Sequence, residues 1–432
     1  MTGRRPGPPG AWYQKSVLPG GLIVLTERMG RLRSAAVGIW VKKGSRDESA
    51  ADSGISHFIE HLVFKGTESR SCREIARTID RTGGLTDAST SKEFATFSVK
   101  VMDEHLPVAL DLLADILTHP AFDPGELENE RKVIFEEIKS VQDDPGDYIG
   151  EVYYESYFAN HSLGRSILGT EQTVGALARD RIVSFFHDSY SPSNIIVSAA
   201  GNVDHDALTD FFATRFGSPG KLPAGTSIEP SPVPHPGRVY LRKKDLEQTH
   251  INIGFPGLHR AHDDRYALFV LNDILGGGMS SRLFQNIREK CGLAYSIHSY
   301  NTSFRDAGSL AVYTAVDHSE SIRTIRLVMD EIAKLCRGEI ESQELEDSKA
   351  HLKGSLMLGL ESSSARMAAL ALNEMYFGRQ FTPDEILDAI TAVSLDDIVG
   401  LAQRLFVPSE ISLVVLGSKS KIDLEGIDLN VF

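Results

Sequence analysis

An internal repeat divides this sequence into two halves with one plan. When the chain of 432 residues is compared with itself at an offset of 216 residues, 180–201 aligns without a gap with 396–417. In each copy a helical pattern runs into a proline turn and then into an apolar strand that ends at glycine, which is typical of an α+β unit. The repeat therefore predicts two homologous domains. The residues of the first copy that recur identically include Asp180, Ile182, Val183, Pro192, Ser193 and Gly201.

The two halves are separated by a segment that is poor in core-forming residues. Residues 217–237 hold six of the 18 prolines of the chain, which stiffen the backbone without supplying a core. We therefore expect an N-terminal domain at 1–216, a linker at 217–237 and a C-terminal domain at 238–432. Strand patterns open each half, at 22–28 and 35–44 in the first and at 238–244 and 249–255 in the second.

Charge and composition limit the classes of partner. A net charge of −14 opposes binding to nucleic acid and to anionic membranes, which need a cationic surface, but it tolerates a cationic peptide. The three cysteines, Cys72, Cys291 and Cys336, are too few and too scattered for a disulfide framework or a four-cysteine zinc site. The N-terminus lacks the apolar run of a secretory signal, and the chain has no stretch of about 18 apolar residues. We therefore expect a soluble, cytoplasmic protein.

A short helix carries the first chemical signal. The segment GISHFIEHLVFK, residues 54–65, predicts a helix that is capped by Ser53 and ends at Gly66. His57 and His61 are four residues apart and share a face, so two imidazole nitrogens can bind one metal ion. Glu60 lies beside them and can face a water without being a ligand. This His-x-x-Glu-His order is an inverted metallopeptidase motif; the alternative is a structural histidine pair beside an ion-paired glutamate.

A second helix offers carboxylates. Asp123, Pro124 and a capping-box Glu126 predict a helix start, and Pro145 limits its end. Glu130 and Glu137 are seven residues apart on one face of this helix. One can be a third zinc ligand, and the other can accept the second ring N–H of a ligand histidine. The same helix also carries Glu128 and Glu136, which can simply be solvated, and the residues alone do not choose among these glutamates.

Together these segments resemble peptidase family M16, which includes pitrilysin, insulysin and the β subunit of the mitochondrial processing peptidase. The resemblance rests on HFIEH and on ERKVIFEE downstream, and it covers nearly the whole chain, whose length resembles that of the short two-domain members. It implies a zinc endopeptidase of two α+β domains, each a mostly antiparallel β-sheet packed with helices. It also implies one zinc per chain, bound by His57, His61 and Glu137, with Glu60 as general base and Glu130 supporting a ligand histidine.

The resemblance also assigns a role to the second half. The family uses an arginine and a tyrosine seven residues apart, and RLFQNIREKCGLAYS supplies Arg288 and Tyr295 at that spacing. Such donors suit the substrate backbone and the oxyanion that forms at the carbonyl. The second-half counterpart of HFIEH, VLNDILGG, has no histidine, so we expect one half to hold the metal and the other to hold this polar clamp.

Substrate binding is expected on a strand. In the family the segment that matches GGLTDASTSKEFATFSV offers its edge to an extended peptide, which implies substrate contacts at Ala88, Ser89 and Thr90. Asp87 departs from the asparagine that is usual there. Extended pairing favours peptides and unfolded polypeptides as substrates. Members of this length form two-subunit clamshells, so we expect a homodimer, with a hetero-partner as the alternative.

Two other functions fit the same resemblance. One is a non-catalytic structural subunit similar to the core proteins of the respiratory bc1 complex, which tend to have degraded motifs, whereas HFIEH, Glu137, Arg288 and Tyr295 are all present here. The other is a peptidase that removes cationic targeting presequences, which differs in substrate and not in chemistry.

The expected ligands also favour zinc as the metal, because two imidazoles and a carboxylate suit zinc well.

Overall fold

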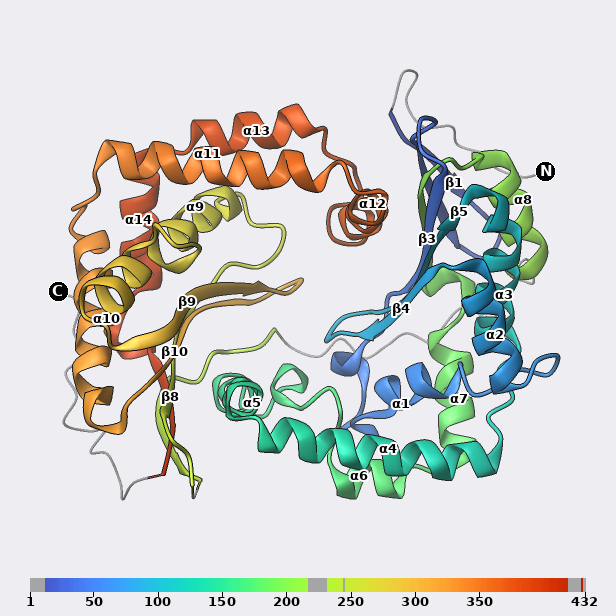
Figure 1. The fold of residues 1–432 in the computed structure, drawn as a ribbon, viewed down its shortest axis with the longest axis horizontal. Coiled ribbons are helices and arrows are strands. Elements are labelled where there is room, and N and C mark those ends of the chain that lie inside the picture. The colour runs from blue at the N-terminus through green and yellow to red at the C-terminus, as the bar shows by residue number, and fades with distance from the viewer. Residues whose placement is uncertain (1–11, 217–230, 244, 419–428, 430–432) are drawn as a thin grey trace. The chain divides into compact units, whose positions relative to one another are not determined.

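The computed structural model describes residues 12–216, 231–243, 245–418 and 429 (Figure 1). Within these residues no helix is both long and apolar enough to cross a membrane. The chain forms two compact units. The first contains the described residues of Met1–Lys139, Arg165–Glu229 and Leu358–Gln380, and the second contains those of Ser140–Gly164, Pro230–Met357 and Phe381–Phe432.

The first unit is built on a six-stranded sheet in the order β1-β2-β6-β3-β5-β4. All neighbouring strands pair antiparallel except β2 and β6, which are parallel. The central strands β3 and β6 are buried at nearly every position, so side chains on both faces of this sheet are covered. The strands are β1 (Gln14–Val17), β2 (Ile23–Arg28), β3 (Ser34–Val41), β4 (Leu85–Thr90), β5 (Ala95–Met102) and β6 (Ile195–Gly201).

Helices of the first unit enclose its main core. The core is formed by side chains of the sheet and of the helices that cover one face, with Phe58, Phe97 and Phe212 among its fully buried members. The helices are α1 (Ile55–Leu62), α2 (Cys72–Thr82), α3 (Leu106–Thr118), α4 (Pro124–Asp143), α6 (Glu171–Ala176), α7 (Arg179–Ser189), α8 (His205–Phe216) and α12 (Ser363–Phe377).

The second unit repeats this plan with a five-stranded sheet in the order β7-β11-β8-β10-β9. Its one parallel pair is β7 with β11, which matches the parallel pair of the first sheet. The strands are β7 (Gly237–Arg242), β8 (Thr249–Pro256), β9 (Ala294–Ser303), β10 (Gly308–Val316) and β11 (Ser412–Gly417). The helices are α5 (Pro145–Tyr157), α9 (Arg265–Gly276), α10 (Ser321–Cys336), α11 (Ser342–Gly359), α13 (Pro383–Ala392) and α14 (Leu395–Leu405).

The repeat found in the sequence is a repeat of structure. In the first copy α7 is followed by a short 3-10 turn at Pro192–Asn194 and then by β6; in the second, α14 is followed by Pro408–Glu410 and then by β11. The two turns lie 216 residues apart. The predicted α+β class, with two mostly antiparallel sheets packed by helices, is thus confirmed.

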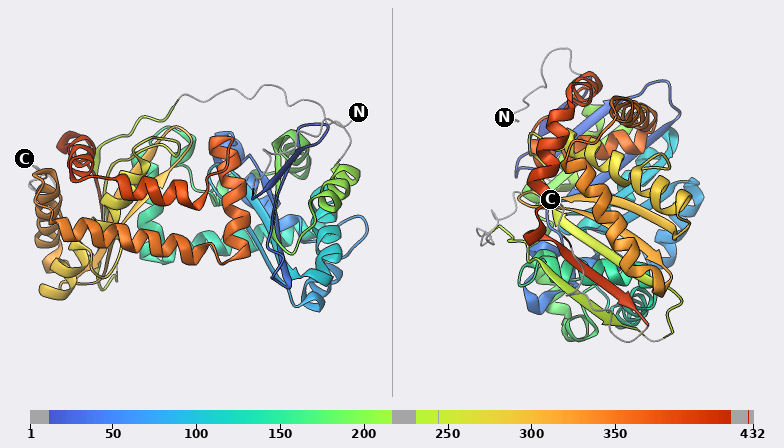
Figure 2. Two further views of the ribbon diagram at one scale, coloured as in Figure 1. Left: turned by 90° about the horizontal axis from the view of Figure 1, so that it is seen from above. Right: turned by 90° about the vertical axis from the view of Figure 1, so that its left-hand side faces the viewer.

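Each unit also contains a helix from the other half of the sequence. Helix α12 packs on strands β2, β3 and β6 of the first sheet (Figure 2), where Met367 and Leu370 lie against Trp40 and Ile196. Helix α5 covers β8 and β11 of the second sheet. Because a covered sheet face excludes water from its apolar side chains, each unit needs the exchanged helix. The contiguous domains 1–216 and 238–432 stay a prediction, and most of the expected linker, 217–230, lies outside the described residues.

Candidate metal centre

The start of α1 differs from the expectation. Ser53 does not cap this helix; the N-cap is Gly54, in a left-handed conformation with φ of 96° and without a side-chain cap. The free N–H groups at the start of the helix are bonded instead by Glu48. Its carboxylate accepts hydrogen bonds from the backbone N–H groups of Gly54 at 2.9 Å and of Ser56 at 2.8 Å. The prediction of a Ser53 cap was wrong because an acceptor from an earlier loop reaches the same free amides.

The end of α1 also differs. The helix ends at Leu62, and its C-cap is Val63, whereas Gly66 was expected to end it. Gly66 has φ of 134° and forms an isolated bridge with Ser71. It therefore serves the tight turn that follows the helix. That conformation is one that glycine adopts without strain.

The two histidines of α1 lie side by side. Their ring centroids are 4.6 Å apart, as expected for positions i and i+4. Burial, and to a lesser degree the neighbouring His61, lowers the pKa of His57 to about 3. The His57 imidazole is therefore neutral at physiological pH, and neutral imidazole is the form that binds a metal ion.

Helix α4 runs near α1 (Figure 1), and its glutamates reach the imidazoles of α1. As predicted, it starts at Pro124, and the carboxylate of Asp123 accepts hydrogen bonds from the backbone N–H groups of Gly125 at 2.8 Å and Glu126 at 3.0 Å. It ends at Asp143, before Pro145. Along this helix Leu127, Glu130, Ile134 and Ile138 are buried, so the face that carries Glu130 and Glu137 is turned toward α1.

Three ligand atoms converge between α1 and α4. The Oε2 atom of Glu137 lies 3.6 Å from Nε2 of His57 and 3.6 Å from Nε2 of His61. Ligand atoms of these three residues all lie within 4.8 Å of one another. Two imidazoles and one carboxylate form the donor set of a catalytic zinc site. The residues present therefore fit zinc.

Glu130 contacts the ring nitrogen of His61 that does not face Glu137. Its Oε2 atom lies 3.1 Å from Nδ1 of His61. A carboxylate accepts and the ring nitrogen donates, so Nδ1 carries the proton and Nε2 is left to bind the metal ion. The other oxygen, Oε1, pairs with the ammonium group of Lys65 at 2.7 Å. The buried Glu130 is thus compensated by two partners.

The neighbouring glutamates are elsewhere. Glu128 is exposed and pairs with Arg131, and Glu136 is exposed and pairs with Lys139. Neither lies in the group of ligand atoms. The structure thus separates the four glutamates that the sequence left as alternatives.

Glu60 lies beside the ligand group without belonging to it. Its Oε2 atom accepts a hydrogen bond of 2.6 Å from the hydroxyl of Thr90, the last residue of β4. Burial raises the pKa of Glu60, and the nearby carboxylates of Glu137 and Asp87 act in the same direction, while the Thr90 hydrogen bond and His61 oppose them. A carboxylate with a raised pKa is better suited to accept a proton near neutral pH.

The predicted substrate strand lies at an edge. Strand β4 pairs with β5 and is the last strand of the first sheet. Ala88 and Thr90 are half-buried on one face, whereas Asp87 and Ser89 are exposed on the other. Its second edge has no partner strand within the described residues. Ala88, Ser89 and Thr90 thus lie on an edge strand, and the last residue of this strand, Thr90, is hydrogen-bonded to Glu60.

Two family descriptions match successive parts of this chain. The family description "Insulinase (Peptidase family M16)" matches residues 23–171, and "Peptidase M16 inactive domain" matches 176–352. The uncharacterized zinc protease YmxG of Bacillus subtilis is 42% identical over 89% of this chain and 94% of its own length. The chain belongs to peptidase family M16. An uncharacterized zinc protease of Streptomyces coelicolor is 40% identical over 90% of this chain and 86% of its own.

Solved structures share the M16 fold. A protease from Helicobacter pylori has a TM-score of 0.88 at 23% identity, covering 94% of this chain and 99% of that one. A peptidase M16 inactive domain from Pseudomonas fluorescens has a TM-score of 0.86 at 20% identity, covering 94% and 98%. The names of the sequence relatives support zinc as the metal of this M16 protein.

The expected clamp residues of the M16 protein lie together in the second unit. Arg288 belongs to a π-helix over Phe284–Lys290, a rare form that is frequent at functional sites. Its guanidinium lies 5.1 Å from the ring centroid of Tyr295 and 4.4 Å from that of Phe284. Tyr295 is 82% exposed. Both side chains, with Met279 and the glycines 276–278, line a hollow of about 320 Å³.

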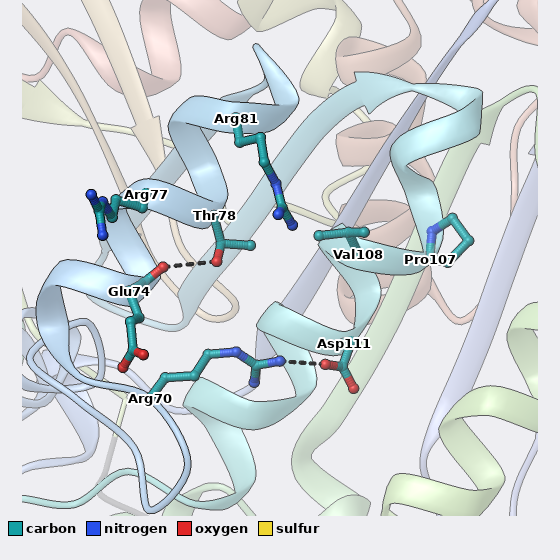
Figure 3. A pocket seen from close by; sticks show the side chains of 8 residues that line it. All are labelled: Arg70, Glu74, Arg77, Thr78, Arg81, Pro107, Val108 and Asp111. Carbon is teal, nitrogen blue, oxygen red and sulfur yellow. Dashed lines mark hydrogen bonds and ion pairs between the residues drawn. The ribbon is translucent and has the colours of Figure 1, made fainter.

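A larger hollow of the first unit lies apart from these residues. It measures about 850 Å³ and is lined by α2 and α3 (Figure 3). Arg70 is paired with Asp111 and Asp115 there, and the Thr78 hydroxyl donates to the backbone oxygen of Glu74. Its lining contains none of the predicted site residues. The cavity therefore lies outside the candidate metal centre.

Two residues that support the centre, Lys65 and Glu48, were not predicted from the sequence. Lys65 lies four residues after His61. This spacing could have indicated that the two side chains lie on the same face of a helix. Glu48 lies in the segment SRDESAADSG, whose composition is typical of an exposed loop. Yet Glu48 is only 5% exposed. Nothing in the local pattern marks it as buried.

Proposed function

We propose that this protein is a zinc-dependent endopeptidase that hydrolyses peptides or unfolded polypeptides held in an extended conformation. The observation that carries the proposal is the convergence of His57, His61 and Glu137 beside a carboxylate, Glu60, that is held outside the ligand group. Three protein ligands are typical of catalytic zinc sites, because structural sites close all four positions. Zinc, when bound, acts as a Lewis acid and lowers the pKa of water.

The side chains divide the work of hydrolysis. Glu60 accepts the proton of the attacking water and delivers it to the leaving amine. Its Thr90 hydrogen bond restricts the carboxylate to one orientation, which favours a reactive geometry. Glu130 keeps His61 in the tautomer that offers Nε2.

The edge of β4 supports the choice of substrate. An extended peptide that pairs with this edge would have its backbone bonded from Leu85 toward Thr90, where Glu60 is located. Backbone pairing depends on conformation more than on side chains. A segment inside a folded protein has its backbone groups already bonded, so folded proteins are expected to be poor substrates.

We further propose that the protein works as a homodimeric clamshell in which Arg288 and Tyr295 act on substrate bound at the zinc of the partner subunit. The pair is suited to this role because it is accessible and because Arg288 is stacked on an aromatic ring that limits its motion. Donors of this kind stabilise the oxyanion of the tetrahedral intermediate.

The proposed activity is tested with the purified protein and a quenched fluorescent peptide of about 10 residues, the length of one paired strand. We expect cleavage that chelator abolishes, with about one zinc per chain. The Glu60→Gln variant should keep zinc and lose activity by at least about 100-fold, the range of general-base catalysis. Cleavage by Glu60→Gln at the wild-type rate would remove Glu60 from this role, and absence of zinc would refute the proposal.

The dimeric arrangement is tested by complementation. Glu60→Gln and Tyr295→Phe subunits are each expected to be inactive as homodimers. After random mixing, a hetero-dimer has one site with both residues intact, so about a quarter of the wild-type activity should return. Failure of activity to return, although mixed dimers form, would place the tyrosine in the same subunit as the zinc it serves, and full activity of the Tyr295→Phe homodimer would place it outside catalysis.

A further inference from the structure

A loop of the first unit links the metal-binding helix to the substrate strand. Residues 44–54 run between β3 and α1. At the start of this loop the backbone N–H of Ser45 donates to the backbone oxygen of Ser91 at 3.1 Å, and that of Arg46 donates to Lys92 at 2.8 Å. Both acceptors belong to the turn between β4 and β5. The loop is therefore bonded to the end of β4, directly after Thr90.

A buried ion pair reinforces this junction. The guanidinium of Arg46 lies 2.8 Å from Oε1 of Glu93, and the Arg46 side chain is inaccessible to solvent. Gly44 leaves no room for a side chain, because a Cβ atom there would lie 2.4 Å from the backbone oxygen of Ser91. The start of the loop is thus held rigidly against the turn.

At the other end, Glu48 holds the first turn of α1. Each oxygen of its carboxylate accepts one backbone N–H group, from Gly54 at 2.9 Å and from Ser56 at 2.8 Å. Arg165 donates to the backbone oxygen of Glu48 at 2.6 Å. A Cβ atom at Gly54 would lie 2.6 Å from the backbone oxygen of Leu168, so the helix start is confined from both sides.

The chemistry of this contact requires a carboxylate. The first amides of a helix lack partners within the helix, and at a buried start no water replaces them. A carboxylate offers two acceptor oxygens, whereas a glutamine side chain offers one oxygen and an NH2 group that repels a second N–H. Burial penalises the charged form of Glu48, so a neutral cap would be the more stable choice. The contact is better explained by geometry than by stability.

We propose that Glu48 is a positioning residue for the peptidase reaction: it fixes the first turn of α1 relative to the end of β4, so that Glu60 meets Thr90. The inference rests on the proposed function. Because α1 is a short rigid helix, a shift at Gly54 and Ser56 is passed on to His57 and Glu60. A misplacement of about 1 Å at a reacting group can cost about 100-fold in rate.

The test compares variants of the full-length protein. Glu48→Gln removes one of the two acceptors. Glu27→Gln is the matched control, because Glu27 is equally buried in the same unit but pairs with Arg366, away from the metal centre. Glu48→Asp keeps the charge on a shorter side chain and serves as the second variant if Glu48→Gln does not fold. For each protein we would measure zinc content, kcat, KM and the midpoint of thermal unfolding.

We expect Glu48→Gln to keep about one zinc per chain and to lose kcat by about 10- to 100-fold with KM changed by less than about twofold, because orientation and not binding is lost. Glu27→Gln should lower the unfolding midpoint while kcat stays within about twofold of wild type. Equal kcat values for Glu48→Gln and wild type, or parallel losses in the two glutamine variants, would overturn the inference.

A failure of the proposed function is distinguishable. If the wild-type protein cleaves no peptide, the rate of zinc release to a chelator replaces kcat as the measured quantity. Faster release from Glu48→Gln than from wild type and Glu27→Gln would support positioning of the helix by Glu48. Equal release rates would refute it.

Discussion

Glu130 and His61 form the contact that orders the metal centre. The carboxylate of Glu130 lies 3.1 Å from Nδ1 of His61, across 69 residues of sequence, and turns Nε2 of the same ring toward Glu137. Because Lys65 holds the second oxygen of Glu130 at 2.7 Å, this carboxylate keeps its orientation. The ring and the carboxylate therefore act as one unit in metal binding.

The Glu130→Gln variant tests this relationship. Loss of the charged acceptor should weaken zinc binding by about 10- to 100-fold, the usual effect of removing such a supporting group. Zinc affinity is measured by competition with a coloured chelator. Glu128→Gln, an exposed change on the same helix, should leave the affinity unchanged; an equal loss in both variants would contradict a specific role for Glu130.

Glu137 is expected to be the third ligand. Glu137→Gln should lower zinc affinity by at least about 100-fold, which is more than the loss expected for Glu130→Gln. The loss is larger because this substitution removes a charged ligand of the metal itself. Its neighbour Glu136, which is exposed and paired with Lys139, provides the control. Full zinc occupancy of Glu137→Gln at limiting metal would show that another group completes the site.

Thr90 is expected to act on the rate and not on metal binding. Thr90→Val keeps the shape of the side chain and removes the hydroxyl that donates to Glu60, so kcat should fall by about 10-fold, the equivalent of one hydrogen bond to a charged group. Zinc content should not change. Thr86→Val on the same strand is the control, since the Thr86 hydroxyl has no hydrogen-bond partner within the described residues.

Glu48 should make stability depend on pH. Burial raises the pKa of Glu48 to about 7 in the folded protein, above its ordinary value in an unfolded chain. The folded state thus binds this proton more tightly, so the contribution of Glu48 to stability is present below the unfolded pKa and is lost as pH rises through about 7. Thermal unfolding of wild type and Glu48→Gln between about pH 4 and 8, the window that spans both pKa values, should show the variant gaining relative stability toward high pH. A constant difference would contradict the raised pKa.

Several features were accessible to local patterns. The cap at Asp123, the start of α4 at Pro124 and the four-residue spacing of the histidines depend on residues within a few positions, and each was predicted. The start and end of α1 were not. The cap at Ser53 failed because Glu48, six residues away from Gly54, folds back over the helix start. Gly66 failed as a helix end because its turn pairs with Ser71.

The sequence by itself determined the duplicated α+β plan and the positions of His57, Glu60 and His61 on one helix, because repeats and helical spacings are properties of the chain. Only the tertiary structure separated Glu130 and Glu137 from Glu128 and Glu136, since a glutamate's role depends on which face of α4 meets α1. It alone showed that α5 and α12 are exchanged between the two units. It also showed the burial of Glu48. These features arise from contacts between distant segments, which compete for the same buried space and leave no local pattern.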